Sequence, residues 1–299
     1  MNPDNFWIIP AFATPLLFAV SSIVNKWLID KHFPGAVSSL IFMLLSNLLF
    51  VPLGLFGNLF WFKAWHWSLI LGVIYGGMFY FQLKVLKEKE ASEVAILSRS
   101  KPIVLAILAH FLLRENLPVG AYVGIGLLTL GGMLISGKQW RFINKQTVKN
   151  YGYLFTFILL SSLVSIGQKY IITPQNTWQV TYWMNMGTIL TGLLLLGLPL
   201  RRQQFLKYLK LIPGKVYVTK ISSQIAYLAG TLAHSFALAY GSVSIVGGIY
   251  SIQPLMVILI ASLLTLYFPG IIKEDVSSSS LGRKIAAVAL VIGGSWLLL

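Results

Sequence analysis

Ten apolar runs, each about as long as a bilayer-crossing helix, dominate this sequence. A helix needs about 20 mainly apolar residues to cross the hydrocarbon core. The runs are separated by turn-forming or charged stretches, and they cover residues 8–29, 36–57, 67–86, 94–113, 118–136, 151–172, 178–199, 217–240, 243–268 and 281–299. The connections between them are too short to fold as separate soluble domains. The sequence therefore predicts an all-α membrane protein with ten transmembrane helices.

The composition excludes the common soluble classes. Of the 299 residues, 57% are hydrophobic and 10% are charged, whereas soluble domains carry roughly 25% charged residues. A water-soluble enzyme or a nucleic-acid-binding domain is excluded, although the net charge is +15. The chain has no cysteine, which excludes disulfides and thiolate metal sites. We expect the lipid bilayer and a small-molecule metabolite as partners, no nucleic acid, no cofactor or metal, and a monomer or homodimer.

The cations are distributed unevenly between the two sides of the predicted membrane. Eighteen of the 23 Lys and Arg residues fall in connections after odd-numbered spans. Three fall after even-numbered spans, namely Lys63, Arg114 and Lys169, and the other two, Arg99 and Lys101, lie inside the fourth span. Because cytoplasmic connections carry the excess of cations, this bias predicts a multi-pass protein of the cell (inner) membrane with both termini outside.

The two halves of the chain repeat each other. Residues 22–27 read Ser-Ile-Val-Asn-Lys-Trp near the end of the first span, and residues 165–170 read Ser-Ile-Gly-Gln-Lys-Tyr near the end of the sixth. Three further residues have counterparts at a common offset of 152: Tyr75 with Tyr227, Gln82 with His234, and Pro102 with Pro254. A duplicated five-span unit inserts upside down, as in many secondary transporters. We therefore predict inverted repeats at 1–137 and 151–299, joined by a cytoplasmic linker at 138–150.

These features resemble the EamA-type members of the drug/metabolite transporter superfamily. The resemblance is carried by residues 83–115, where a charged link precedes a helix with a mid-span Pro102 and a closing Arg114-Glu115, and by the glycine-bearing helix 124–135. The segment Asn25–Leu28 followed by Phe33-Pro34 is also similar to the triose-phosphate and nucleotide-sugar branch. The resemblance implies ten helices, a cavity lined by helices 1, 3, 4, 6, 8 and 9, and peripheral helices 5 and 10. It also implies cytoplasmic termini, opposite to the cation count.

Arg99 is the main candidate for binding a substrate anion. Arg99 and Lys101 lie two residues apart, about 200° around a helix, so they cannot share a face. Arg99 falls on the more polar face, and its guanidinium suits a carboxylate or phosphate. The alternative is a structural ion pair with Glu93 or Glu90. Lys101 is expected to reach the interface or to cap carbonyls that Pro102 frees.

Further polar residues inside the spans are candidates for the cavity wall. The predicted substrate-binding set, besides Arg99, is Tyr75, Gln82, Tyr227, His234, Tyr250, Ser251 and Gln253. The matched pairs Asn25-Lys26 and Gln168-Lys169 are candidates for a gate or a cavity mouth. The alternative for each lysine is an interfacial anchor beside an aromatic residue.

Absent residues narrow the mechanism. All eight Asp and Glu residues lie at or near the ends of predicted spans, which disfavours proton-driven cation export through a mid-membrane carboxylate. We therefore predict a secondary transporter (exporter, exchanger or facilitator) that works by alternating access. Its substrate would be a small polar metabolite, anionic or zwitterionic, such as an amino acid, an organic phosphate or a sugar derivative. The alternatives are a lipid-phosphate flippase, a membrane-embedded enzyme or a non-transporting subunit, but no catalytic motif supports an enzyme.

Overall fold

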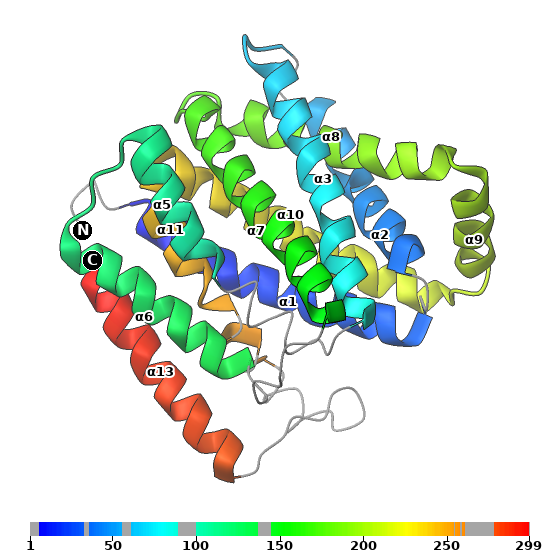
Figure 1. Ribbon diagram of the computed structural model, residues 1–299. Helices are drawn as coiled ribbons and strands as arrows, with labels where there is room; N and C mark the ends of the chain where they lie inside the picture. The colour runs from blue at the N-terminus through cyan, green and yellow to red at the C-terminus, as the bar shows by residue number, and fades with distance from the viewer. Residues whose placement is uncertain are drawn as a thin grey trace.

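The computed structural model describes residues 6–32, 36–55, 61–88, 100–136, 145–253, 255–257, 259–260 and 278–298. All regular secondary structure in these ranges is helical (Figure 1). The elements of the first half are α1 (Ile8–His32), α2 (Ala36–Leu45), the 3₁₀ helix η2 (Ser46–Leu55), α3 (Trp65–Glu88), α5 (Lys101–Leu113) and α6 (Val119–Ser136). Those of the second half are α7 (Lys145–Ile171), α8 (Thr177–Gly197), α9 (Pro199–Leu209), α10 (Gly214–Tyr240), α11 (Val243–Tyr250) and α13 (Ser278–Leu298).

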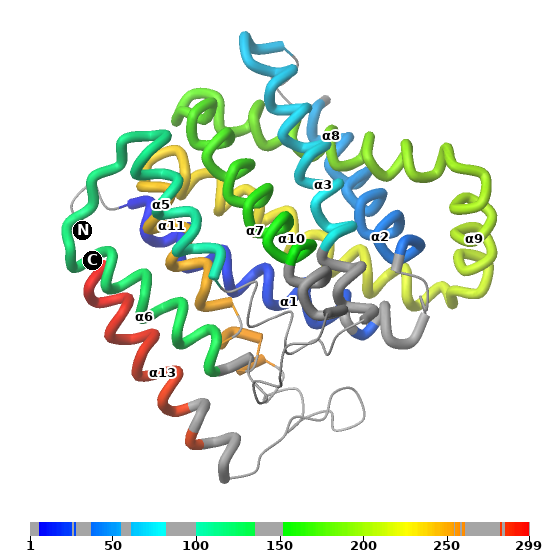
Figure 2. The backbone as a smooth tube through the Cα atoms, in the orientation of Figure 1, coloured from blue at the N-terminus to red at the C-terminus, as the bar shows by residue number. Residues whose placement is uncertain are grey.

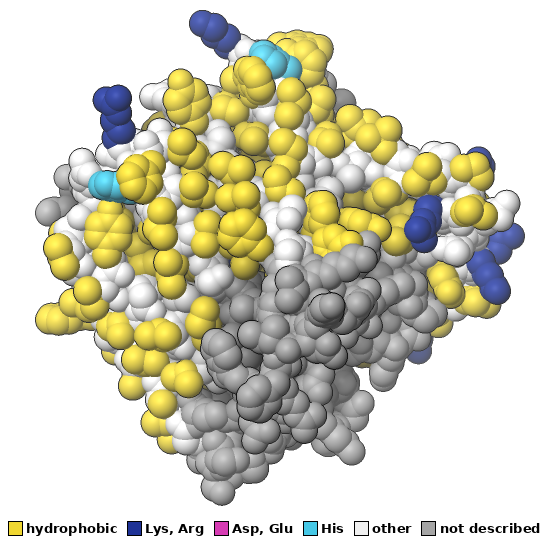
Figure 3. All heavy atoms as spheres, viewed as in Figure 1, with side chains coloured by type: hydrophobic (Ala, Val, Ile, Leu, Met, Phe, Trp, Pro, Cys, Tyr) yellow, Lys and Arg dark blue, Asp and Glu magenta, His cyan; other side chains and the backbone are white. Residues whose placement is uncertain are grey.

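The helices have the length and surface of a membrane protein. Each predicted apolar run contains a described helix, and four stretches of the described residues are long and apolar enough to span a bilayer: Ile8–Asn25, Val37–Gly54, Gly152–Ile171 and Thr177–Gly197. Figure 3 shows large apolar side chains over much of the visible face, and Phe111 and Trp296 are 73% and 78% exposed. Such a surface suits lipid and not water. The number of ten crossings stays a prediction.

Several boundaries differ from the sequence expectation. Helix α7 begins at Lys145, inside the segment predicted as a linker. Helix α9 was not predicted, because it lies in a connection too polar to count as a span; Pro199 occupies its first turn, a position that proline favours. Helix α5 begins at Lys101 with Pro102 in its first turn. Residues 89–99 and 261–277, parts of the predicted fourth and ninth spans and their connections, lie outside the described residues.

The helix pairs place six helices around the middle of the bundle. Helix α1 packs along α10, α3 packs against α7 and α8, and α5 packs against α7 and α11. Helices α6 and α13 pair with each other and form one edge in Figure 1. Figure 2 shows the same arrangement as a tube, with α6 and α13 side by side. Side chains from α1, α3, α5, α7, α10 and α11 therefore meet in the interior.

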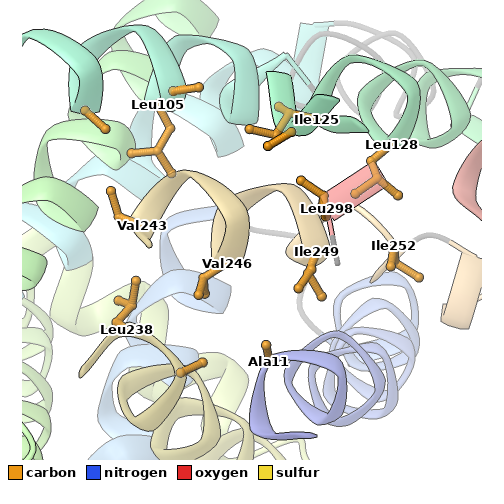
Figure 4. Close-up of a cluster of buried hydrophobic side chains, with 14 of the residues drawn as sticks. Ala11, Leu105, Ile125, Leu128, Leu238, Val243, Val246, Ile249, Ile252 and Leu298 are labelled. Carbon is orange, nitrogen blue, oxygen red and sulfur yellow. The ribbon is translucent and has the colours of Figure 1, made fainter. Parts of the chain in front are cut away.

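The largest apolar cluster packs α11 against its neighbours. Leu105 of α5, Leu128 of α6 and Ile249 of α11 are almost fully buried (Figure 4). Lipid tails are as apolar as these side chains, so close van der Waals packing, and not the hydrophobic effect, holds such helices together. This cluster fixes the position of α11, which carries Tyr250 on its last turn.

Glycines allow α3 and α8 to approach closely. A Cβ atom on Gly72 of α3 would collide with the Met184 carbonyl of α8, and one on Gly187 of α8 would collide with the Leu69 carbonyl of α3. Gly77, also on α3, has open space where its Cβ would lie. Small residues of this kind are typical of tight helix contacts in membranes.

We expect Gly72→Ala to destabilise the protein and Gly77→Ala to leave it unchanged or stabilise it. The first change pushes α3 away from α8, at a cost of about 1–3 kcal/mol. The second removes only backbone freedom, a gain of about 0.5–1 kcal/mol. Thermal denaturation in one detergent compares the two variants. Equal melting temperatures would contradict the close helix contact.

Candidate functional site

Aromatic side chains from four helices meet in the middle of the bundle. The Tyr75 hydroxyl of α3 is hydrogen-bonded to the Tyr227 hydroxyl of α10. The Phe18 ring of α1 lies 5.3 Å from the Tyr227 ring and 5.8 Å from the Tyr250 ring of α11. Tyr250 is also close enough to Tyr75 for their hydroxyls to interact electrostatically. Three tyrosines predicted from separate parts of the sequence are thus brought together.

His234 adds a polar group with an unfilled hydrogen-bonding position. Its ring centroid lies 6.2 Å from that of Tyr250. Its Nδ1 atom is buried and, among the described residues, has no hydrogen-bond partner. Buried polar atoms of folded proteins are nearly always paired. An unpaired ring nitrogen close to the Tyr250 ring is therefore a position where a ligand group can bind.

Lys101 lies in the interior, which corrects the sequence expectation for it. Its ammonium donates a hydrogen bond to the Ser165 hydroxyl of α7 at 3.3 Å. It is also close enough to His234 for its charge to act on that ring. Among the described residues, this hydrogen bond goes to α7 and not to a carbonyl near Pro102, because the side chain starts in the first turn of α5. We refer to Phe18, Tyr75, Lys101, Tyr227, His234 and Tyr250 as the central cluster.

A second polar network, which was not predicted from the sequence, joins α8 and α10 to the first half. The Gln224 side-chain amide donates to the Asn47 oxygen at 2.7 Å, and the Asn47 amide donates to the Thr188 hydroxyl at 2.9 Å. Lys220 donates to the Asn25 side-chain oxygen at 2.8 Å. Asn47 and Gln224 have no counterparts at the repeat offset, so matching the two halves does not reveal them. The sequence signal that could have found them is that both are polar residues inside apolar runs, where polar side chains are rare.

Three predicted site residues make hydrogen bonds within a helix or between helices. Gln253 donates to the Ser22 hydroxyl of α1 at 2.9 Å, and Gln168 donates to the Ser235 hydroxyl of α10 at 3.1 Å. The Ser251 hydroxyl donates to the Gly248 carbonyl of its own helix at 2.6 Å. These bonds position α1, α7, α10 and α11 around the central cluster.

Charged hydrogen bonds meet at the junction between α10 and α11, which we define as residues Leu238–Ser244. Lys169 of α7 donates to the Leu238 and Gly241 carbonyls at 2.7 and 2.8 Å. Glu115, between α5 and α6, accepts bonds from the Val243 backbone at 2.9 Å and the Ser244 hydroxyl at 2.7 Å. The Lys169 ammonium thus lies at the carboxyl end of α10, and the Glu115 carboxylate lies at the amino end of α11. The helix dipoles favour both placements.

The Glu115 contacts connect the two halves of the chain. The carboxylate also accepts bonds from the Ser242 hydroxyl at 2.9 Å and the Ser244 backbone at 3.3 Å. Lys169 was predicted from the sequence as a gate residue, whereas Glu115 had no predicted role beyond a span end. Because Glu115 belongs to the first half and its partners to the second, separation of the halves at this end would break these bonds.

Other predicted site residues are not placed. Arg99 lies outside the described residues, and so do the side chains of Gln82 and Lys26. Within the described ranges, no three His, Asp or Glu side chains gather as a metal site requires. Two surface hollows, of about 510 and 410 Å³, are lined by residues of α9 and its neighbours and not by the central cluster.

Comparisons with known proteins bear on the fold of the whole chain and on the family of its first half. The fold is similar to that of a protein known from its crystal structure, with a TM-score of 0.71 and 15% sequence identity, over 97% of this chain and 94% of the other. At that identity the similarity concerns the fold alone. No curated protein matches the sequence. Residues 5–137, which make up most of the first half of the chain, match the EamA-like transporter family of the drug/metabolite transporter superfamily.

Proposed function

We propose that this membrane transporter moves a small polar metabolite, anionic or zwitterionic, by alternating access around the central cluster. Members of the EamA-like family are transporters and not enzymes, which disfavours the alternatives of a membrane-embedded enzyme and a flippase. The observation that carries the substrate proposal is the combination of the Lys101 ammonium with the unpaired His234 Nδ1 atom.

The chemistry of the central cluster favours an anion. Lys101 has three donor hydrogens, and the Ser165 hydroxyl takes one of them. Among the described residues, the hydrogen bonds of Lys101 include none to a carboxylate, so a substrate carboxylate or phosphate would supply the countercharge. Tyrosine rings accept the apolar body of a solute while their hydroxyls bond its polar groups. A cation would find no carboxylate in this part of the described structure.

The pattern of helix pairs supports two repeats related by a pseudo-two-fold axis. In chain order, the helices of the first half correspond to those of the second as α1 to α7, α2 to α8, α3 to α10, α5 to α11 and α6 to α13. A two-fold axis pairs each element with its counterpart, and α2–α8, α5–α11 and α6–α13 are such pairs. A two-fold axis also requires that a contact between two helices recurs between their counterparts. The contact of α1 with α10 recurs as the contact of α7 with α3. On this basis we propose repeats at 1–137 and 151–299, related as alternating access requires.

The Lys169 and Glu115 contacts would then serve as a gate. The Glu115 contacts join the halves at the end of the bundle where α10 passes into α11. The Lys169 contacts hold the same junction from within the second half. Opening toward this end requires the Glu115 carboxylate to leave the amino end of α11. We propose that substrate exchange on this side follows that separation, and that the cation distribution places this side outside the cell.

A metabolite panel tests the proposed substrate class. We expect carboxylates, phosphates or amino acids to raise the melting temperature of the purified wild type, since a ligand that binds the folded state stabilises it. Organic cations of similar size should not. Compounds that stabilise are then measured for uptake into vesicles containing the protein. Stabilisation and uptake of cations alone would overturn the proposal.

A further inference from the structure

Helix α9 presents a dense group of cations. Between residues 199 and 215 the chain carries Arg201, Arg202, Lys207, Lys210 and Lys215 and no acidic residue. Four of these five side chains are exposed, and Arg201 is partly exposed. Figure 3 shows dark-blue side chains gathered at the side of the molecule where Figure 1 places α9. The helix precedes the first turn of α10, so it lies at the opposite end of α10 from the α10–α11 junction.

Helix α9 and the turn that follows it carry exposed leucines beside the cations. Leu206 is 39% exposed and Leu211 is 71% exposed. Together with Gln203, Lys207 and Lys210 they line a hollow of about 510 Å³. On the other side of α9, Phe205 is buried and Leu209 packs against a small apolar cluster of α10 and its neighbours. One face of α9 is therefore packed against the protein, and the face that lines the hollow is exposed.

We propose that this hollow binds the headgroup of an anionic phospholipid. The two ammonium groups and the Gln203 amide match a phosphate with its polar substituents. The two leucines match the glycerol and the first methylene groups, a pairing that a free anion would not use. The helix also follows α8, a membrane span, directly, which puts it at the interface where headgroups lie. Clusters of cations on an amphipathic helix are typical of binding to anionic lipids.

Lipid binding by purified protein tests the proposal. Native mass spectrometry would count phosphatidylglycerol and phosphatidylcholine retained by the wild type and by the Lys207→Gln/Lys210→Gln variant. We expect the wild type to prefer phosphatidylglycerol and the variant to lose affinity for it about 25-fold, at about fivefold per lysine. The control Lys63→Gln/Arg114→Gln also loses two exposed cations, both outside this group, and should bind as the wild type does.

A second variant and a competitor distinguish a bound lipid from a bound free anion. A Leu206→Gln/Leu211→Gln variant keeps every charge and should still lose phosphatidylglycerol, because the apolar contacts are gone. Inorganic phosphate at millimolar concentration should not displace the lipid. Equal binding by the Lys207→Gln/Lys210→Gln variant and its control would overturn the proposal, as would full displacement by phosphate or equal retention of phosphatidylcholine. Circular dichroism and gel filtration of each variant confirm that it is folded.

Discussion

A Lys101→Gln variant is expected to lose binding and uptake of anionic substrates by at least about tenfold, while remaining folded. In the structure the ammonium of Lys101 is held in the interior by Ser165 and lies near His234. A bound carboxylate or phosphate would otherwise be left in a medium of low polarity without a countercharge, which is costly. Glutamine keeps a hydrogen-bond donor of similar length, so the comparison isolates the charge. The readout is uptake of the anion that stabilises the wild type most strongly.

Matched variants separate charge from shape. Lys101→Arg keeps the cation and should retain part of the uptake. Lys63→Gln removes an exposed cation and should leave uptake unchanged. If Lys101→Gln transports the anion as well as the wild type does, Lys101 is not the anion site, and Arg99, the residue favoured from the sequence, becomes the next to test.

Removing the Glu115 carboxylate is expected to open the bundle at the α10–α11 junction. A Glu115→Ala variant loses four hydrogen bonds between the two halves. Bonds to a charged group contribute roughly 1.5–3 kcal/mol each and are not additive, so a shift of about 30-fold or more toward the open form is expected. Because the chain has no cysteine, spin labels can be attached at Val119→Cys and Tyr170→Cys, two highly exposed positions in different halves.

The measured quantity is the distance distribution between these two labels in lipid. In the Glu115→Ala variant the longer distances should gain population. Lys169→Gln should have a smaller effect in the same direction, because Lys169 holds in place the junction that Glu115 binds. Lys63→Gln is the control. Identical distributions in the wild type and in both variants would show that these contacts do not act as a gate.

The sequence predicted where side chains would gather better than it predicted what each one contacts. Tyr75 and Tyr227 were selected from the sequence by their common offset of 152, and both residues lie in the central cluster. Lys101 was misplaced because residues 94–113 were treated as one continuous helix. The described helix begins at Lys101, and a long side chain in a first turn can reach a neighbouring helix that a helical wheel does not represent.

Contacts between helices could not be predicted from the sequence for a general reason. The bond from Gln224 to Asn47 joins residues 177 positions apart, and an apolar pattern fixes which residues form a helix but not which helix lies beside it. Glu115 looked like an ordinary charged residue at a span end, and only the fold brings it to the amino end of α11. Helix α9 was missed because its cations hid a short amphipathic helix inside a predicted connection.

Side-specific labelling of a cysteine in the central cluster tests alternating access most directly. Thr231 lies on α10 between Tyr227 and His234 and its hydroxyl is hydrogen-bonded to Tyr227, so Thr231→Cys places a lone thiol there. Ile225→Cys, 62% exposed on the same helix, is the lipid-facing control. A membrane-impermeant thiol reagent should label Thr231→Cys from the side opposite the α10–α11 junction, and from the junction side once Glu115→Ala is added. A thiol that stays unreactive from both sides, with and without Glu115→Ala, would contradict the account.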